Sequence, residues 1–190
     1  MDNKSLKDFI VVIKNVASIQ ICDKIIEEYK NCNRWRYAVI RAEDEHNPTK
    51  DIRNCEIIKM SDAENLRINT QRIDLDNKVF EIIKKCLTNY RNLFESCSVS
   101  QDSGYDLLRY NQHGFYKEHV DSFAGFHREI ACSLLLNDDF KGGEFTFFDG
   151  KLKYTLNRGD AIMFPSNFMY PHQIMKITEG TRYSIITWFR

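Results

Sequence analysis

A histidine and an aspartate, His119 and Asp121, stand two positions apart in the stretch LLRYNQHGFYKEHVDSF, and His172 follows much later. Side chains of an extended strand alternate between its faces, so His119 and Asp121 would point the same way. Two imidazoles and one carboxylate, without a fourth protein ligand, form the facial triad that holds Fe(II) in non-haem oxygenases. A closed zinc site would need four ligands, preferably thiolates, and no cysteine has a ligand-like spacing here. A short H-x-D pattern also arises by chance, so an ordinary strand histidine is the alternative.

An arginine near the C-terminus begins a stretch that reads as a strand buried on both faces. Alternation divides the stretch into two largely apolar sets, Arg182, Ser184, Ile186 and Trp188 on one face and Tyr183, Ile185, Thr187 and Phe189 on the other. A lone buried charge is costly, so the guanidinium of Arg182 needs an anionic partner. A ligand carboxylate held through two hydrogen bonds would serve, and so would an acid from another strand.

The second half of the chain reads as a run of short strands. From Gly104 onward, turn-forming residues separate eight stretches: YDLLRY, GFYKEHVD, EIACSLLLN, GEFTFF, KLKYTLN, DAIMFP, HQIMKI and TRYSIITWF. Strands of this length and spacing predict a β-sandwich or barrel.

The first half predicts helices with a few strands between them. The expected elements are strands at 9–13, 35–40 and 55–60, helices at 19–30 and 74–94, and a long polar loop at 41–54. Ser18 would cap the first helix. Long loops in compact domains often act as lids, and we expect the loops at 41–54 and 122–128 to close over a substrate. Helices followed by strands indicate the α+β class, with the helices packed against one sheet.

The composition limits the class of protein. The chain has 190 residues, 43% of them hydrophobic, which suits one domain with a substantial core. Lys and Arg together number 27, as do Asp and Glu, so no basic face for nucleic acid is expected. The apolar run at 9–13 is too short for a signal peptide or a membrane span. Six scattered cysteines without a C-x-x-C pair read as reduced thiols, which predicts a cytoplasmic protein.

Several longer motifs accompany the candidate triad. They are LLRYNQHGFYKEHVD, the following REIACSLLLN, the hairpin FKGGEF, and LNRGDAIMFPS with the later HQIMKITEGTRYSIITW. In this order and spacing they make residues 107–189 resemble the prolyl 4-hydroxylase-like branch of the 2-oxoglutarate and Fe(II)-dependent dioxygenases, and in particular the bacterial PKHD-type hydroxylases. The N-terminal half resembles that family only loosely, through its strand–helix–strand start, Trp35 and the short motif IRNC.

The resemblance implies a fold, cofactors and a reaction. It implies a double-stranded β-helix, or jelly-roll, in a single domain over 1–190, with a helical support and lid loop over 1–100 and the jelly-roll core over 104–190. The protein would use Fe(II), the co-substrate 2-oxoglutarate and O₂, with ascorbate in support. The implied reaction is hydroxylation of an unactivated C–H bond, first of all in a prolyl residue of a peptide or protein, with release of succinate and CO₂.

The same resemblance implies roles for individual residues. His119, Asp121 and His172 would ligate the iron, and Arg182 would bind the distal carboxylate of 2-oxoglutarate. Tyr110 would lie beside this co-substrate, with plain core packing as the alternative.

Other residues carry weaker implications. Trp188, at the pocket edge, and Arg128 are candidates for substrate contact, with plain packing or a structural role as the alternative. The Gly142-Gly143-Glu144 turn is expected to be structural, because glycine permits a close backbone approach at a strand start. His113 and His127 fall in loops near the expected site, and we expect neither to bind metal.

One position departs from the family pattern. Relatives often have tyrosine where this chain has Leu135, and that tyrosine hydroxyl helps to hold the distal carboxylate. The co-substrate would therefore depend more on Arg182, with help from another hydroxyl such as Thr187 or Tyr110. Tyr116, at an odd spacing from His119, should lie on the opposite strand face and pack behind the site.

Two alternative functions stay open at this point. Within enzymes, the substrate could be a free amino acid, another protein side chain or a small molecule. Outside enzymes, the chain could be a jelly-roll binding module without catalysis. Release of CO₂ from 2-oxoglutarate would separate the two classes. The sequence does not determine the oligomeric state.

Overall fold

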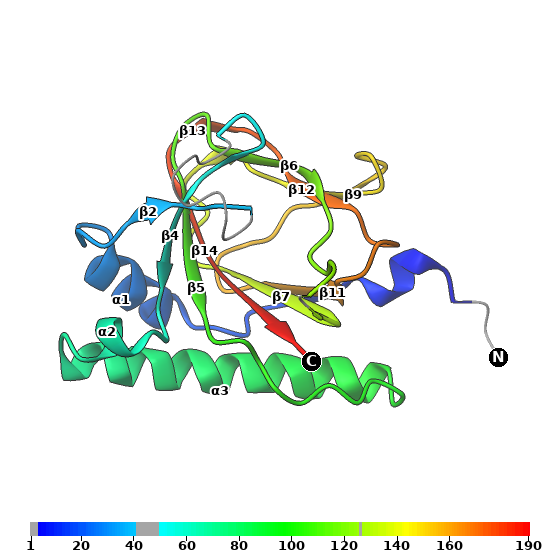
Figure 1. Cartoon of the computed structure of the whole chain (residues 1–190), viewed down its shortest axis with the longest axis horizontal. Helices are drawn as coiled ribbons and strands as arrows, with labels where there is room; N and C mark the ends of the chain where they lie inside the picture. The colour runs from blue at the N-terminus through cyan, green and yellow to red at the C-terminus, as the bar shows by residue number, and fades with distance from the viewer. Residues whose placement is uncertain (1–3, 41–49, 126) are drawn as a thin grey trace.

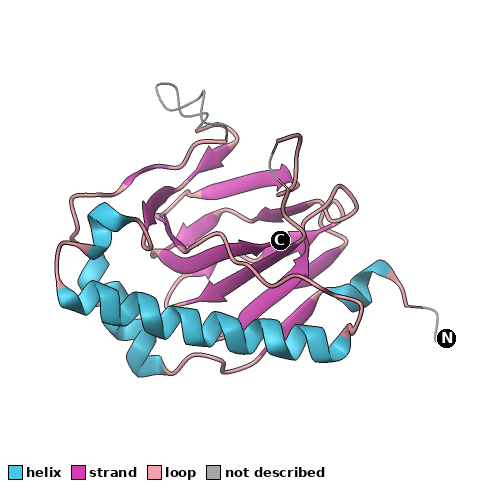
Figure 2. Ribbon diagram, turned by 60° about the horizontal axis from the view of Figure 1, so that its bottom comes forward, coloured by secondary structure: helices cyan, strands magenta, loops and turns pink. Residues whose placement is uncertain are grey.

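Two antiparallel β-sheets face each other, and helices cover the outer face of the larger one (Figures 1 and 2). The computed structural model describes residues 4–40, 50–125 and 127–190. This arrangement is the jelly-roll that the family resemblance implied, with helices added on one side. The expected α+β class is confirmed.

The larger sheet has seven strands in the order β1-β11-β7-β14-β5-β4-β2. Their bounds are Val11–Ile13 (β1), Ala161–Pro165 (β11), Ile130–Leu135 (β7), Arg182–Phe189 (β14), Asp106–Tyr110 (β5), Glu56–Lys59 (β4) and Arg36–Tyr37 (β2). β14 pairs with β7 on one side and β5 on the other. This central strand is covered on both faces, as its largely apolar sequence predicts.

The smaller sheet has five strands in the order β10-β9-β12-β6-β3. Their bounds are Leu152–Tyr154 (β10), Phe145–Phe147 (β9), His172–Ile174 (β12), Phe115–His119 (β6) and Arg53–Asn54 (β3). A separate two-stranded ribbon joins β8, Lys141–Gly142, to β13, Ile177–Glu179. The pairing of β6 with β12 brings two segments that are distant in sequence side by side.

The long helix α3, Thr70–Leu93, runs along the larger sheet (Figure 1). Asn69 caps its N-terminus by accepting a hydrogen bond from the backbone N–H of Arg72 at 2.9 Å. The shorter helices are η1 at Leu6–Phe9, α1 at Ile19–Tyr29 and α2 at Ala63–Leu66. Ser18 caps α1 as predicted, because its side chain accepts from the N–H of Ile21.

Two apolar cores separate the layers. The outer core lies between the helices and the larger sheet and includes Ile25, Val79, Leu107 and Ile185. The inner core lies between the two sheets and includes Leu108, Tyr110, Phe147 and Phe164. Leu107 and Leu108 are neighbours on β5 and face opposite cores, as strand alternation requires.

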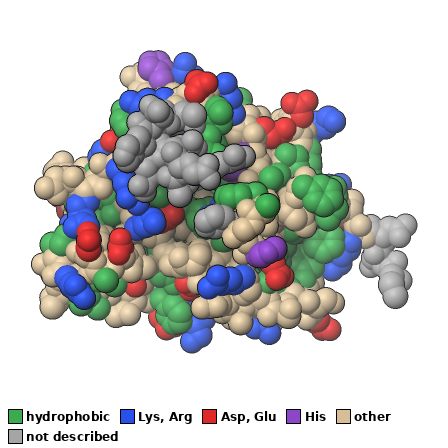
Figure 3. All heavy atoms as spheres, in the orientation of Figure 1, with side chains coloured by type: hydrophobic (Ala, Val, Ile, Leu, Met, Phe, Trp, Pro, Cys, Tyr) green, Lys and Arg blue, Asp and Glu red, His purple; other side chains and the backbone are tan. Residues whose placement is uncertain are grey.

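Charged side chains of both signs occur on the face of the molecule seen in Figure 3. Acidic and basic side chains are intermixed there, which agrees with their equal numbers in the sequence. None of the helices in the described parts of the chain has both the length and the apolar character that a membrane span requires.

Most expected elements are present, with shifted ends. All eight strands expected after Gly104 are found, as β5, β6, β7, β9, β10, β11, β12 and β14. The strand expected at 35–40 shrinks to β2, and the helix expected at 74–94 begins at Thr70, because the cap at Asn69 was missed. The expected lid at 41–54 falls mostly on 41–49, outside the described residues, and its end forms β3. The single-domain organisation stays a prediction.

Candidate metal centre

The predicted triad comes together between the two sheets. His119 ends β6, His172 begins β12, and the two are direct partners in the antiparallel pair. Asp121 lies just beyond the end of β6. Its two carboxylate oxygens lie 3.6 Å from Nε2 of His119 and 3.5 Å from Nε2 of His172. Within the described residues, this is the one group of three or more His, Cys, Asp or Glu side chains placed to hold a metal ion.

Both imidazoles are oriented by backbone carbonyls. Nδ1 of His119 lies 2.9 Å from the carbonyl oxygen of Lys117, and Nδ1 of His172 lies 3.0 Å from that of Tyr170. A carbonyl oxygen only accepts, so each Nδ1 carries the proton and donates it. The lone pair of each Nε2 is therefore directed at the centre, which is the arrangement found in histidine metal ligands.

The electrostatics suit a cation. Burial raises the pKa of the Asp121 carboxyl, but His172 and His119 lower it more, so its pKa stays below the ordinary 3.8. Burial lowers the pKa of His172 from 6.5 to about 4, although Asp121 acts in the opposite direction. Near neutral pH the centre thus offers a carboxylate and a neutral imidazole. Oδ2 of Asp121 is buried and accepts no hydrogen bond, an unmet demand that a metal ion would satisfy.

A bulge in β6 places Tyr116 inside the site. Tyr116 pairs with Ile174, and His119 pairs with His172, so three steps on β6 face two steps on β12. The extra residue turns Tyr116 to the same face as His119. The two rings stack with centroids 3.5 Å apart and planes 16° apart. The prediction that Tyr116 packs behind the site is therefore wrong, because it assumed a regular strand.

Arg182 is buried at the inner end of the same pocket. Its side chain is 2% exposed, and Nη1 donates a hydrogen bond of 2.7 Å to Oγ of Ser184. Its Cζ atom lies 5.5 Å from the centroid of the Tyr110 ring. No described carboxylate lies within ion-pair distance of it, so the alternative of an acid from another strand is not found. Burial lowers its pKa, which marks a charge without full compensation.

The pocket that joins these residues is narrow. Its walls include Arg53, Tyr110, Tyr116, His119, His172 and Arg182, and its volume is about 40 Å³. A co-substrate would therefore enter only as the surrounding side chains move apart.

The glycine turn before β9 is structural, as expected. Gly143 has φ +68°, and a Cβ there would lie 2.4 Å from Cδ1 of Ile177 and 3.1 Å from Cδ of Arg182. The left-handed backbone and this close approach both favour glycine. The turn thus packs directly against the stem of the buried arginine.

Trp188 lines the pocket, and Arg128 contacts it from outside the pocket. The Cζ atom of Arg128 lies 3.6 Å from the centroid of the Trp188 ring. Nη1 of Arg128 also donates to the backbone carbonyl of Asp121 at 3.2 Å. The guanidinium is thereby tied to both the tryptophan and the triad segment. The contact with Asp121 favours the structural alternative for Arg128.

Sequence analysis missed three polar groups of the pocket: Arg53, Ser133 and Ser184. Arg53 lies over the Tyr116 ring at 4.6 Å and donates to the carbonyl of Val39. The motif IRNC contains Arg53 and was the available signal. The suggestion that Thr187 assists the co-substrate is wrong, because Thr187 alternates with the pocket-facing Ser184 and Trp188 and so faces the helices.

The remaining histidines lie elsewhere. His113 and His127 are exposed, and neither belongs to the triad.

Comparison with known proteins agrees with this geometry. Residues 105–190 match the family model described as the 2OG-Fe(II) oxygenase superfamily. A PKHD-type hydroxylase of Idiomarina loihiensis is 34% identical over 88 residues, which cover 43% of this chain and 39% of that protein. Human prolyl 3-hydroxylase 2 is 34% identical over 67 residues, 33% of this chain and 10% of that protein. The chain thus matches well under half the length of these curated relatives.

Solved structures share the fold over almost the whole chain. A prolyl hydroxylase from Trichoplax adhaerens, in complex with a hypoxia inducible factor peptide fragment, superposes with a TM-score of 0.74 at 14% identity, covering 95% of this chain and 83% of that one. A Pseudomonas putida prolyl-4-hydroxylase gives 0.69 at 19% identity, covering 96% and 92%. The expected resemblance is confirmed: residues 105–190 are similar to the 2OG-Fe(II) oxygenases, and the similar proteins include PKHD-type and prolyl hydroxylases.

Proposed function

We propose that this chain is an Fe(II)- and 2-oxoglutarate-dependent dioxygenase that hydroxylates a prolyl residue of a peptide or protein and releases succinate and CO₂. One observation carries the proposal. His119, His172 and the buried, incompletely compensated Arg182 line the same pocket, and Asp121 completes the triad with an unsatisfied carboxylate oxygen. Such a pocket suits a ligand with a metal-binding end and an anionic end, and 2-oxoglutarate has both.

The protein's first task is to hold the metal. Nε2 of His119, Nε2 of His172 and a carboxylate oxygen of Asp121 are the proposed ligands. These three residues would hold Fe(II) and would leave further coordination positions for the co-substrate and O₂. When bound, Fe(II) supplies the redox chemistry by which O₂ and 2-oxoglutarate yield succinate, CO₂ and a hydroxylated carbon.

The second task is to orient the co-substrate. Arg182 would pair with the distal carboxylate through two N–H donors. Ser184 accepts from Arg182, so its own O–H remains free to donate to that carboxylate. Ser184 could thereby replace the tyrosine hydroxyl that this chain lacks at Leu135. Tyr110 would lie alongside, as its distance from Arg182 supports.

The third task is to keep water away from the reacting centre. The ring of Tyr116 covers one face of His119, and the rings of Phe145 and Phe147 lie 5.5 Å and 5.7 Å from His172. An apolar wall strengthens electrostatic interactions within the site and limits side reactions. Trp188 and Arg128 stand at the opening, where a substrate chain would pass.

A prolyl substrate is supported by the relatives, whose names include prolyl 3-hydroxylase and prolyl 4-hydroxylase. A peptide substrate is supported by the peptide in the Trichoplax complex. We also propose that residues 1–190 act as one domain, because α1 and α3 of the first half pack on the sheet built mainly by the second.

The test is formation of succinate from 2-oxoglutarate with Fe(II), ascorbate and O₂, with and without proline-containing peptides. We expect slow turnover without peptide, faster turnover with a suitable one, and a mass increase of one oxygen on the peptide. Asp121→Ala should abolish turnover, while Asp149→Ala, at an exposed carboxylate outside the triad, should not. Absence of succinate, together with absence of 2-oxoglutarate binding under anaerobic conditions, would reject the enzyme in favour of a non-catalytic module.

A further inference from the structure

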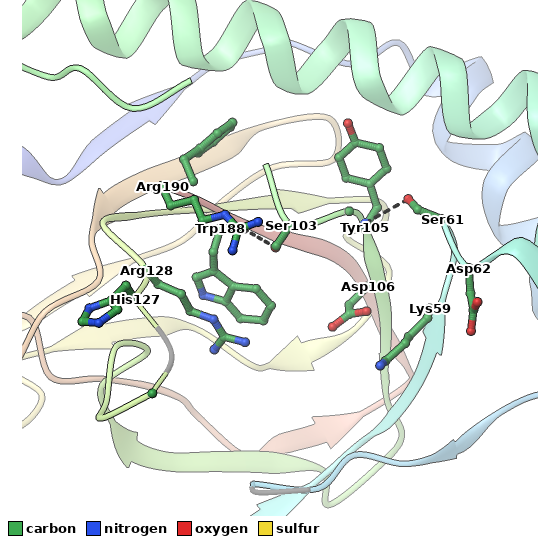
Figure 4. A pocket seen from close by; sticks show the side chains of 13 residues that line it. Lys59, Ser61, Asp62, Ser103, Tyr105, Asp106, His127, Arg128, Trp188 and Arg190 are labelled. Carbon is green, nitrogen blue, oxygen red and sulfur yellow. Dashed lines mark hydrogen bonds between the residues drawn. The ribbon is translucent and has the colours of Figure 1, made fainter. Parts of the chain in front are cut away.

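A second, wider cavity lies beside the metal pocket. Its volume is about 880 Å³, and Trp188 lines both cavities. Charged side chains of its wall include Lys59, Asp106, Arg128 and Arg190 (Figure 4). A space of this size admits a ligand of several residues. A substrate chain that reaches the metal past Trp188 would therefore lie in this cavity.

Asp106 lines this cavity from the larger sheet. It begins β5 and pairs with Lys59 of β4 on one side and Ile186 of β14 on the other. Because side chains of a strand alternate, Asp106 lies on the same face of β5 as Leu108 and Tyr110. This face is directed toward the inner core. Tyr110 lies four residue steps further along the strand, or roughly 13 Å away. In Figure 4 its carboxylate lies between Trp188 and Lys59.

The Asp106 carboxylate has no partner among the described residues, in either hydrogen bonds or ion pairs. The nearby guanidinium of Arg128 is instead held against the Trp188 ring and the Asp121 carbonyl. Arg53 is similarly tied to Cys55 and Val39.

The electrostatics indicate an unmet demand for positive charge. Burial raises the pKa of Asp106, although Lys59, Arg53, Arg128 and Arg36 all act to lower it. The cations of the protein therefore do not compensate the partial desolvation of this carboxylate. A cation placed next to Asp106 would supply what they lack.

We propose that Asp106 is a specificity-determining residue that binds a cationic group of the substrate a few residues away from the position that is hydroxylated. The inference rests on the proposed function and narrows its substrate class to peptides with a basic group close to the proline. The group is an ammonium or guanidinium, either on a side chain or at a free N-terminus. A neutral substrate would leave the half-buried carboxylate without a partner.

Lys59 is the competing cation within the protein. It is exposed, and its strand position is directly opposite Asp106. An ammonium that swings toward Asp106 would have to be displaced by the substrate. Removing it as Lys59→Met should therefore tighten the binding of a cationic peptide, whereas Asp106→Asn should abolish the preference.

The experiment uses N-acetylated proline peptides in which lysine, norleucine or glutamate is moved through the flanking positions, and a matched pair with free and acetylated N-termini. Binding is measured by fluorescence anisotropy with Fe(II) and 2-oxoglutarate under anaerobic conditions, and hydroxylation as kcat/KM. We expect the best lysine or free-amine peptide to exceed its neutral counterpart about tenfold, between the effects of exposed and buried ion pairs. The ratio within each variant controls for any change in its folding.

Asp106→Asn should bring the ratio close to one, and Asp106→Lys should reverse it in favour of glutamate. Asp62→Asn, at an exposed carboxylate of the same cavity, should retain the ratio. Equal binding of cationic and neutral peptides by the unmodified protein, or a ratio that survives Asp106→Asn, would overturn the inference. Succinate formation by the unmodified protein without peptide is scored separately, so a failure of the proposed function is recognised independently.

Discussion

Replacing Arg182 with methionine should stabilise the free protein and strongly weaken its binding of 2-oxoglutarate. The guanidinium is 2% exposed and donates to one hydroxyl, that of Ser184, among the described residues. An unsatisfied buried polar group costs about 1–3 kcal/mol, and a charged group more. Methionine keeps much of the apolar stem without the charge. At about 2–4 °C per kcal/mol for a chain of this size, Tm should rise by several degrees.

The loss of binding should be larger than this gain. Truncating one partner of a buried, hydrogen-bonded charge pair costs about 2–5 kcal/mol. At 1.4 kcal/mol for each factor of ten, the Kd of 2-oxoglutarate should rise roughly thirtyfold to several thousandfold. With Fe(II) present, 2-oxoglutarate should consequently raise the Tm of the unmodified protein. At the same concentration it should leave the Tm of Arg182→Met unchanged.

Thermal unfolding under anaerobic conditions, with and without 2-oxoglutarate, measures both effects in one series. Arg72→Met is the matched control, because Arg72 is also buried but pairs with Glu28 at 2.7 Å. Its removal leaves a carboxylate unpaired, so Tm should fall. If Arg182→Met lowers Tm as Arg72→Met does, or keeps the unmodified affinity for 2-oxoglutarate, the charge is compensated within the protein and the reasoning is refuted.

Three further outcomes are expected. Asp121→Ala should remove Fe(II) binding, read by calorimetry, while far-ultraviolet circular dichroism stays unchanged; retained affinity would reject the triad. Gly143→Ala should lower the free energy of unfolding by about 1–2 kcal/mol because of the left-handed backbone, and by about 1–3 kcal/mol more because of the contact with Ile177. Gly150→Ala, which has open space around its Cβ, should show only the first effect; urea unfolding measures both. Asp160 is buried, accepts from one ammonium and two backbone N–H groups, and has a lowered pKa. Its stabilisation is present above its ordinary pKa of 3.8 and is lost as pH falls through the lowered value, so the stability gap between the unmodified protein and Asp160→Asn should shrink toward pH 3.

The features that depend on local patterning were predictable. Turn residues divide the second half into eight stretches, and each stretch forms a strand because its apolar side chains can be buried against the core. Ser18 was found as a helix cap because capping acts over three residues. The triad followed from residue types and order, since few residue sets other than two histidines and an aspartate suit such a metal site.

Features that depend on pairing between distant strands were not predictable. The position of Tyr116 depends on a bulge that appears only when β6 is aligned with β12. Arg53 reaches the pocket because β3 pairs with β6, across a long stretch of sequence. The face of Thr187, by contrast, was predictable, because alternation within β14 already set it on the face opposite Arg182.

The arrangement of charge in the pocket argues for a ligand with two distinct ends. Asp121 and Arg182 are both buried and opposite in charge, yet they are not within ion-pair distance of each other. If they paired, each would satisfy the other, and neither a metal nor an anion would gain from binding. Held apart, Asp121 with its two histidines attracts a cation, and Arg182 attracts an anion. The folding of the two sheets therefore keeps both demands unmet, and a metal-chelating dicarboxylate can satisfy both at once.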